Sequence, residues 1–94
     1  MFTWDEEKRE KVIREHKVDF AKITDVFDDP FSIDFTDEEH STPDEIRYGI
    51  IGKTSRYGLV ALYYTFEDEI TAKFITARGA EKWMVNVYEQ QRYR

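Results

Sequence analysis

The sequence contains no cysteine among its 94 residues, and this absence excludes disulfide bonds and thiolate metal sites. A small domain without such cross-links depends on packing, and two Trp, six Tyr and seven Phe supply large side chains for a core. The length predicts one domain that spans residues 1–94, with little room for a separate regulatory module.

Long hydrophobic runs are also missing. No apolar segment approaches the roughly 18 residues that a membrane span needs. The acidic, aromatic start of the chain lacks the basic and apolar regions of a secretory signal peptide. Gly52 and Gly58 form no phosphate-binding fingerprint, and the sequence shows no internal repeat. We therefore expect a soluble, cytoplasmic protein.

Lysine and arginine are absent from residues 25–45, although the segment is rich in carboxylates. The net charge of the chain is -6, which argues against nucleic-acid binding because such binding depends on cations that neutralise phosphates. Without the acidic side chains of this segment, the rest of the chain carries a charge of +3, so a basic concavity is compatible with an acidic flank. The acidic residues of the segment are Asp25, Asp28, Asp29, Asp34, Asp37, Glu38, Glu39, Asp44 and Glu45.

The first predicted helix carries two titratable cations on one side. It opens at Thr3 or Asp5, and in the first case Glu6 completes a capping box. Lys8 and His16 then project in similar directions, because eight residues of an α-helix rotate only about 80° past two full turns. The alternative is that Lys8 is simply solvated and His16 covers the negative end of the helix dipole.

The rest of the chain predicts an α+β domain with two N-terminal helices, a four-stranded antiparallel sheet and a C-terminal helix. Phe20, Ile23, Thr24 and Phe27 have helical spacing after a capping Asp19. The predicted strands cover residues 31–35, 46–51, 59–66 and 70–77, and their short connections favour antiparallel neighbours. The predicted last helix carries an apolar stripe of Ala80, Trp83, Met84, Val87 and Tyr88, which we expect to pack on the sheet.

Several short motifs follow one another in a characteristic order along most of the chain. They are Phe2-x-Trp4-Asp5-x-x-Lys8, His16-x-Val18-x-Phe20, Val26-Phe27-Asp28-Asp29-Pro30, His40-Ser41 with Glu45-x-Arg47, Ile51-Gly52, and Thr76-Ala77-Arg78-x-Ala80 with Tyr88. In order and spacing this pattern resembles the BrnT family of toxins from bacterial type II toxin-antitoxin pairs. The resemblance implies a RelE-like fold and a ribonuclease that slows translation. It also implies a ribbon-helix-helix antitoxin, BrnA-like, that neutralises the toxin and represses the operon.

Three positions depart from the family pattern. The family usually has an arginine soon after Ile-Gly-x-Ser, where the nearest arginine here is Arg56. A second family arginine commonly follows the long central strand, but the corresponding turn here is Glu67-Asp68-Glu69. The family often has a glutamate about four residues beyond Ala80, where this chain has Met84.

Metal-free RNA cleavage needs a base, an acid and a cation for the phosphate, and these needs select five candidate residues. Arg78 is the best single candidate, since a guanidinium at the junction of the last strand and helix can hold a phosphate. The alternative role for Arg78 is an ion pair with Glu81 or the acidic segment, which would make it unavailable to RNA. His16 can act as base or acid, or can be a helix-end histidine of the core. Lys8 and Arg56 can add electrostatic stabilisation, and Tyr88 can donate a proton or stack on a base, although its apolar stripe favours the core.

No cofactor or metal site is expected. Residues 37–40 combine acids with a histidine, but adjacent acids in a loop lack the spaced ligands of a dedicated cation site, so we interpret them as a solvated, mobile loop. Two functions remain open, beside the more remote alternative of an unrelated α+β binding domain. The first is a metal-independent endoribonuclease toxin that acts on RNA and meets DNA only through its antitoxin. The second is a weak or inactive relative that binds the antitoxin and modulates operon repression, which the acidic segment and the missing family residues favour.

Overall fold

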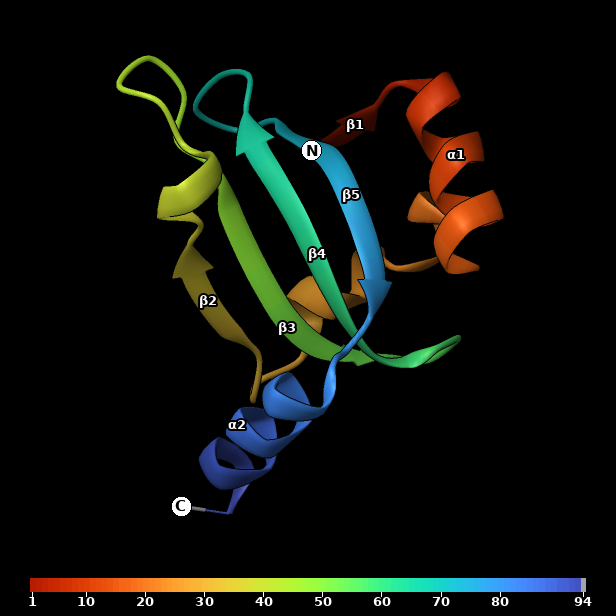
Figure 1. Ribbon diagram of the computed structural model, residues 1–94, viewed down its shortest axis with the longest axis vertical. Helices are drawn as coiled ribbons and strands as arrows, with labels where there is room; N and C mark the ends of the chain where they lie inside the picture. The colour runs from red at the N-terminus through yellow and green to blue at the C-terminus, as the bar shows by residue number, and fades with distance from the viewer. Residues whose placement is uncertain (94) are drawn as a thin grey trace.

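A computed structural model describes residues 1–93, and its central feature is a five-stranded sheet in the order β1-β5-β4-β3-β2. The β1 strand pairs with β5 in parallel, and the other neighbouring pairs are antiparallel. Figure 1 shows α1 beside the β1–β5 edge and α2 at one end of the sheet. The elements are β1 (Phe2–Trp4), α1 (Glu6–His16), η1 (Phe20–Lys22), η2 (Thr24–Asp28), β2 (Ile33–Thr36), η3 (Glu38–His40), β3 (Tyr48–Thr54), β4 (Gly58–Phe66), β5 (Ala72–Gly79) and α2 (Lys82–Arg92), where η denotes a 3₁₀-helix.

The predicted four-stranded antiparallel sheet is wrong, because the first residues of the chain add a parallel edge strand. Phe2 and Trp4 are β1 residues, and their rings lie 5.4 and 5.6 Å from the buried ring of Phe74 on β5. This aromatic packing stabilises an extended segment directly before the helix. Three residues give little periodicity, and a pairing with a strand some 70 residues away leaves no local signal in the sequence.

The second N-terminal helix is also wrong, since residues 20–28 form two short 3₁₀-helices. Ile23 separates η1 from η2 with a φ of -126°, outside the helical range. Phe20, Ile23 and Val26 are all fully buried, and their spacing of three residues matches the 3.0 residues per turn of a 3₁₀-helix. The predicted α-helix rested on Phe20, Ile23, Thr24 and Phe27 instead, and of these only Phe20 and Ile23 are fully buried.

The first helix starts at the second of the two predicted caps. Asp5 is the N-cap, and its carboxylate accepts a hydrogen bond from the Glu7 N–H at 2.8 Å. Thr3 belongs to β1 instead, so the predicted capping box does not form. The helix ends at His16, after which Lys17 adopts a left-handed conformation with a φ of 60°.

The two faces of the sheet are covered unequally. On one face, Val60, Leu62 and Phe74 pack against residues of η1 and η2 in the main core. On the opposite face, which we call the front face, α2 covers only one end, where Met84 and Tyr88 pack on Ile51 and Ala61. The centre of the front face is therefore free to form a site (Figure 1).

The later part of the chain follows its prediction more closely. The C-terminal helix is confirmed as α2, and the predicted strand at 59–66 is β4 with one additional residue. The strands predicted at 46–51 and 70–77 begin and end two or three residues later, as β3 and β5. Within residues 1–93, no helix has both the length and the apolar character required to cross a membrane.

Candidate functional site

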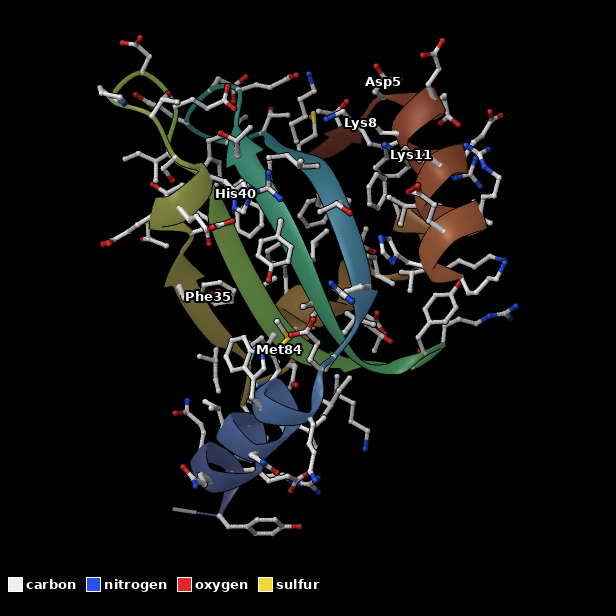
Figure 2. The ribbon with its side chains drawn as sticks, viewed as in Figure 1. Asp5, Lys8, Lys11, Phe35, His40 and Met84 are labelled. Atoms are coloured by element: carbon white, nitrogen blue, oxygen red, sulfur yellow. The ribbon has the colours of Figure 1, made fainter. Side chains whose placement is uncertain are left out.

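The front face carries an open pocket of about 400 Å³ between α1, η3 and the start of α2. Two neighbouring hollows share residues with it and extend it along α1 and β5, and together we call them the front groove. Figure 2 shows Lys8 and Lys11 on α1 and His40 on the opposite side of the exposed sheet face. The main pocket is lined by His16, Phe35, Asp37, Glu39, His40, Arg47, Tyr63, Thr76, Arg78 and Trp83.

Three of the five site residues predicted from the sequence come together in this groove. His16, at the end of α1, and Arg78, on β5, line the main pocket. Lys8 lines the adjoining hollow, which also includes His16. The predicted common side of α1 is thus a wall of the groove, since Val12 between the two cations is buried against the core.

Arg56 and Tyr88 do not join the others. Arg56 is exposed in the turn between β3 and β4 and is not among the lining residues of the groove. Tyr88 is 2% exposed, and its hydroxyl donates a 2.8 Å hydrogen bond to Asp29 Oδ2. Burial and this hydrogen bond raise the pKa of Tyr88 to about 12, which keeps its proton in place near neutral pH. The core role that the sequence favoured for Tyr88 agrees with this contact.

Arg78 forms the ion pair that the sequence analysis gave as its alternative. Its Nη1 lies 3.3 Å from Glu81 Oε1, on the residue that precedes α2. Both side chains are substantially exposed, so the pair contributes at most about 1 kcal/mol and competes weakly with a phosphate. Arg78 therefore keeps its position in the pocket and remains available to a stronger anion.

The main pocket also contains a histidine that the sequence analysis assigned to a mobile loop. His40 Nδ1 lies 3.0 Å from Asp37 Oδ2, and the His40 side chain is 56% exposed whereas that of Asp37 is 13% exposed. Arg47 Nε lies 3.3 Å from the same carboxylate, an ion pair without hydrogen-bond geometry. Because Asp37 holds Nδ1, the other ring nitrogen of His40 is left for a ligand in the groove.

Hydrogen bonds join Asp37 and Ser41 to the backbone of Arg47 across this loop. The Asp37 N–H donates to the Arg47 carbonyl at 2.8 Å, and the Arg47 N–H donates to Ser41 Oγ at 2.8 Å. Ser41 Oγ in turn donates to the Asp37 carbonyl at 2.6 Å. The only sequence signal for the pair of Asp37 and His40 was their spacing of three residues. The His40-Ser41 and Glu45-x-Arg47 motifs supply Ser41 and Arg47, which make these contacts. Among residues 1–93, no group of three or more His, Asp or Glu side chains is arranged to hold a metal ion.

Aromatic rings form the floor of the groove near α2. Phe35 and Tyr63 meet edge to face, with centroids 5.8 Å apart and ring planes at 84°. Gly49 makes room for Phe35, since a Cβ at that position would lie 2.2 Å from the ring atom Cζ. The guanidinium of Arg47 lies 5.3 Å from the centroid of Tyr63, within the range of a cation–π contact.

The groove differs in charge from the rest of the chain. Its lining includes Lys8, Lys11, Arg47, Lys73 and Arg78, together with two histidines. Four carboxylates oppose them, which are Glu15, Asp37, Glu39 and Glu45. The lining thus has a formal charge of +1 on a chain whose total is -6, so the expected basic concavity is modest.

A known structure indicates the class of protein to which this fold corresponds. The crystal structure of the Brucella abortus ribonuclease toxin BrnT is similar, with a TM-score of 0.68 and 25% sequence identity. The similarity covers 87% of this chain and 99% of that chain. The class is that of toxins from type II toxin-antitoxin systems.

Comparison with protein families identifies the particular group. Residues 4–83 match the family described as ribonuclease toxin, BrnT, of type II toxin-antitoxin system. The chain therefore belongs to the BrnT family, as its motifs indicated, and membership of a type II system implies an antitoxin partner. No curated protein matches the sequence.

Proposed function

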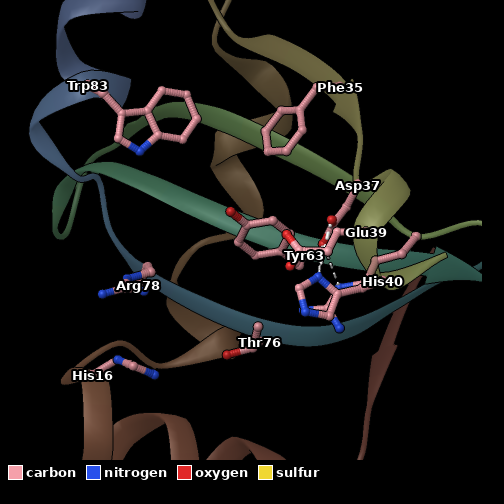
Figure 3. Close-up of a pocket in the computed structure, with 10 residues that line it drawn as sticks. His16, Phe35, Asp37, Glu39, His40, Tyr63, Thr76, Arg78 and Trp83 are labelled. Carbon is pink, nitrogen blue, oxygen red and sulfur yellow. Dashed lines mark hydrogen bonds and ion pairs between the residues drawn. The ribbon is translucent and has the colours of Figure 1, made fainter.

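We propose that this protein is a metal-independent endoribonuclease that cleaves RNA in the front groove. The observation that carries the proposal is the pair of His40 and Asp37, which faces a pocket also lined by His16 and Arg78 (Figure 3). Two imidazoles and a guanidinium around one space supply the base, the acid and the cation that cleavage through a 2′-hydroxyl requires.

The pair with Asp37 favours His40 as the base. A neutral imidazole whose Nδ1–H is held by a carboxylate presents a lone pair at Nε2, and the carboxylate stabilises the imidazolium that follows. In the proposed step, His40 Nε2 accepts the proton of the 2′-hydroxyl while the 2′ oxygen bonds to the adjacent phosphorus. The bond from phosphorus to the 5′ oxygen breaks, and His16 donates a proton to that oxygen. The products are a 2′,3′-cyclic phosphate and a free 5′-hydroxyl.

Arg78 is the proposed phosphate ligand. It lies at the end of β5 in the same pocket, and its exposed ion pair with Glu81 is weak enough to exchange for the doubly negative phosphorane. Lys8 adds positive charge from the side of α1. Arg47 is committed to Asp37 and Tyr63, so we assign it to holding the pocket in shape.

The proposed cellular role is inhibition of translation in the cytoplasm through cleavage of messenger RNA. The partner proposed is a ribbon-helix-helix antitoxin of the BrnA type. An acidic chain suits such a partner, because DNA-binding proteins carry excess positive charge.

A second candidate function is antitoxin binding without catalysis. It is favoured by Met84, which is 2% exposed in the α2 interface at the position where the family often has glutamate. It is also favoured by the turn after β4, where Glu67 and Asp68 occupy the place of a family arginine and Glu67 lies 3.9 Å from Lys73. Such a protein would bind its antitoxin and leave RNA intact.

The test is cleavage of an end-labelled RNA by purified protein in the presence of EDTA. We expect His40→Ala to lower kcat/KM by at least about 100-fold and Arg78→Ala by about 100-fold, with circular dichroism unchanged. Arg14→Ala is the matched control, because Arg14 is an exposed arginine of α1 that does not line the groove. Product ends should be 2′,3′-cyclic phosphates. Absence of cleavage by wild-type protein, with antitoxin binding retained, would support the second candidate, and full activity of His40→Ala would refute the assigned base.

A further inference from the structure

Trp83 is an exposed aromatic residue at the α2 end of the front groove. Its side chain lies in the first turn of α2 and is 53% exposed, and it lines the main pocket. The indole N–H donates a 2.8 Å hydrogen bond to Glu81 Oε2, which fixes the edge of the ring. No other aromatic ring among residues 1–93 packs against the indole, so its exposed surface beside the pocket is available to a ligand.

The opposite side of the same space is also aromatic. Figure 3 shows the Phe35 ring across a gap from the Trp83 ring, with the Tyr63 ring beside Phe35. Phe35 and Tyr63 support each other edge to face, and Phe35 lies against Gly49, where no side chain separates the ring from the strand. Three aromatic rings thus line this space, together with the polar side chains of Asp37 and Arg47.

A single carboxylate connects these rings to the proposed phosphate ligand. Glu81 contacts Trp83 through Oε2 and Arg78 through Oε1, at 2.8 and 3.3 Å respectively. The aromatic space and the guanidinium are therefore held next to each other by one residue at the start of α2. A ligand that has a planar apolar ring next to a phosphate fits both.

The geometry points to a base-binding site in which an unpaired nucleobase of RNA enters between Trp83 and the Phe35–Tyr63 pair. The inference rests on the proposed function and adds to it the class of substrate, which is single-stranded RNA. A base reaches the space only after it leaves its helical stack, which costs a few kcal/mol in a duplex and much less in a single strand. Stacking accepts every base, since each has a π-face, and purines have the larger area.

The inference is tested by binding, which separates it from cleavage. The probe is a fluorescent 2′-O-methyl octamer of adenosines, which has no free 2′-hydroxyl to react, and the comparison is an abasic octamer with the same phosphates and the same 2′-O-methyl groups. We expect Trp83→Ala to weaken binding of the adenosine octamer by about tenfold or more, the range for loss of one stacked base. The same variant should change the affinity for the abasic octamer by less than about twofold.

Two further variants control for folding and for general effects of aromatic residues. Trp83→Phe retains a ring at the site and should restore most of the affinity. Tyr93→Ala removes an aromatic side chain that is 75% exposed beyond the other end of α2, outside the groove, and should bind both octamers like wild type. The inference is overturned if Trp83→Ala binds adenosine octamer normally, or if it loses affinity equally for both octamers. Because neither octamer is cleaved, an inactive but base-binding protein would refute the proposed ribonuclease and leave the base site standing.

Discussion

Replacing Tyr88 with Phe removes one hydroxyl from the interface between α2 and the sheet and leaves the ring in place. The ring is 2% exposed and packs in the cluster with Ile51, Ala61 and Met84. The hydroxyl donates to Asp29 Oδ2 at 2.8 Å and so ties α2 to the segment after η2. We expect this variant to be less stable than wild type and to keep full activity on RNA per folded molecule.

The expected loss of stability depends on the hydrogen bonds that Asp29 keeps in the variant. Hydrogen bonds to charged groups contribute about 1.5–3 kcal/mol. Without Tyr88 the carboxylate still accepts the Phe31 N–H at 2.9 Å and the Lys53 N–H at 2.7 Å, so it is not left unpaired. The expected loss is therefore at the lower end, about 1.5 kcal/mol, which lowers the Tm of a domain of this size by roughly 6–12 °C.

The pH dependence gives a second, independent signature. Burial and the Asp29 hydrogen bond raise the pKa of Tyr88 to about 12, compared with an ordinary value of 10.0. The unfolded chain then loses this proton at lower pH than the folded protein, so the contribution is complete below pH 10 and falls as the pH rises toward 12. Over that interval the wild type loses a stabilising contribution that Tyr88→Phe does not have, so the stability difference between the two proteins narrows. Burial also raises the pKa of Tyr63 and Tyr64, and their titration is common to both proteins.

The assay is urea unfolding followed by circular dichroism at pH 7 and from pH 9 to 12, together with RNA cleavage at pH 7 and 20 °C. The difference between the two proteins in free energy of unfolding should be largest at pH 7–9 and should shrink at higher pH. Equal stability at all pH values would refute the hydrogen bond to Asp29. A stable variant with lost cleavage would refute the structural role and return Tyr88 to the catalytic residues.

Two other predictions concern charged residues of α1. Arg9 holds Asp19 through two hydrogen bonds of 2.8 and 3.0 Å and keeps the pKa of Asp19 below its ordinary value, so wild type should lose stability as the pH falls from about 4 through that lowered pKa. Asp19→Asn should be less stable than wild type at pH 7 and should lack this part of the acid transition in urea titrations. Lys8→Ala should weaken RNA binding without regard to base sequence and reduce the slope of log affinity against log salt by about 0.7, measured by fluorescence anisotropy; an unchanged slope would place Lys8 outside the RNA contact.

The predictability of each element depends on whether its cause is local. The α1 wall with Lys8 and His16 was predictable, because helical rotation alone relates the two residues. The β1 strand was not, because its stability comes from rings on β5, far away in the sequence. The apolar stripe of α2 shows an intermediate case. Its period identified the helix, but Met84 is buried whereas Trp83 is 53% exposed, and only the docking angle of α2 determines which part of the stripe meets the sheet.

The site shows the same division. Arg78 was predicted as a site residue from its place at the junction of a strand and a helix, and it lines the pocket, whereas its catalytic role stays a prediction. His40 was assigned to a solvated, mobile loop, because the hydrogen bonds that position it join Asp37 and Ser41 to the backbone of Arg47 across the loop. Polar residues in a turn are held in a fixed arrangement only by such hydrogen bonds across the loop. The amino-acid composition of the loop does not reveal these bonds.

The charge of the chain explains why stacking matters for the proposed substrate. Of the cations in the groove, Arg47 is paired with the largely buried carboxylate of Asp37, whereas the exposed ion pairs of Lys73 and Arg78 are weak, which leaves Lys8, Lys11, Lys73 and Arg78 as the proposed phosphate contacts. Four such contacts give a salt slope of only about -3 for a single strand. The rest of an acidic surface repels RNA, so phosphates alone give weak binding confined to the groove. The proposed base site at the exposed ring of Trp83, in the same pocket as Arg78, would supply affinity that the phosphate contacts do not.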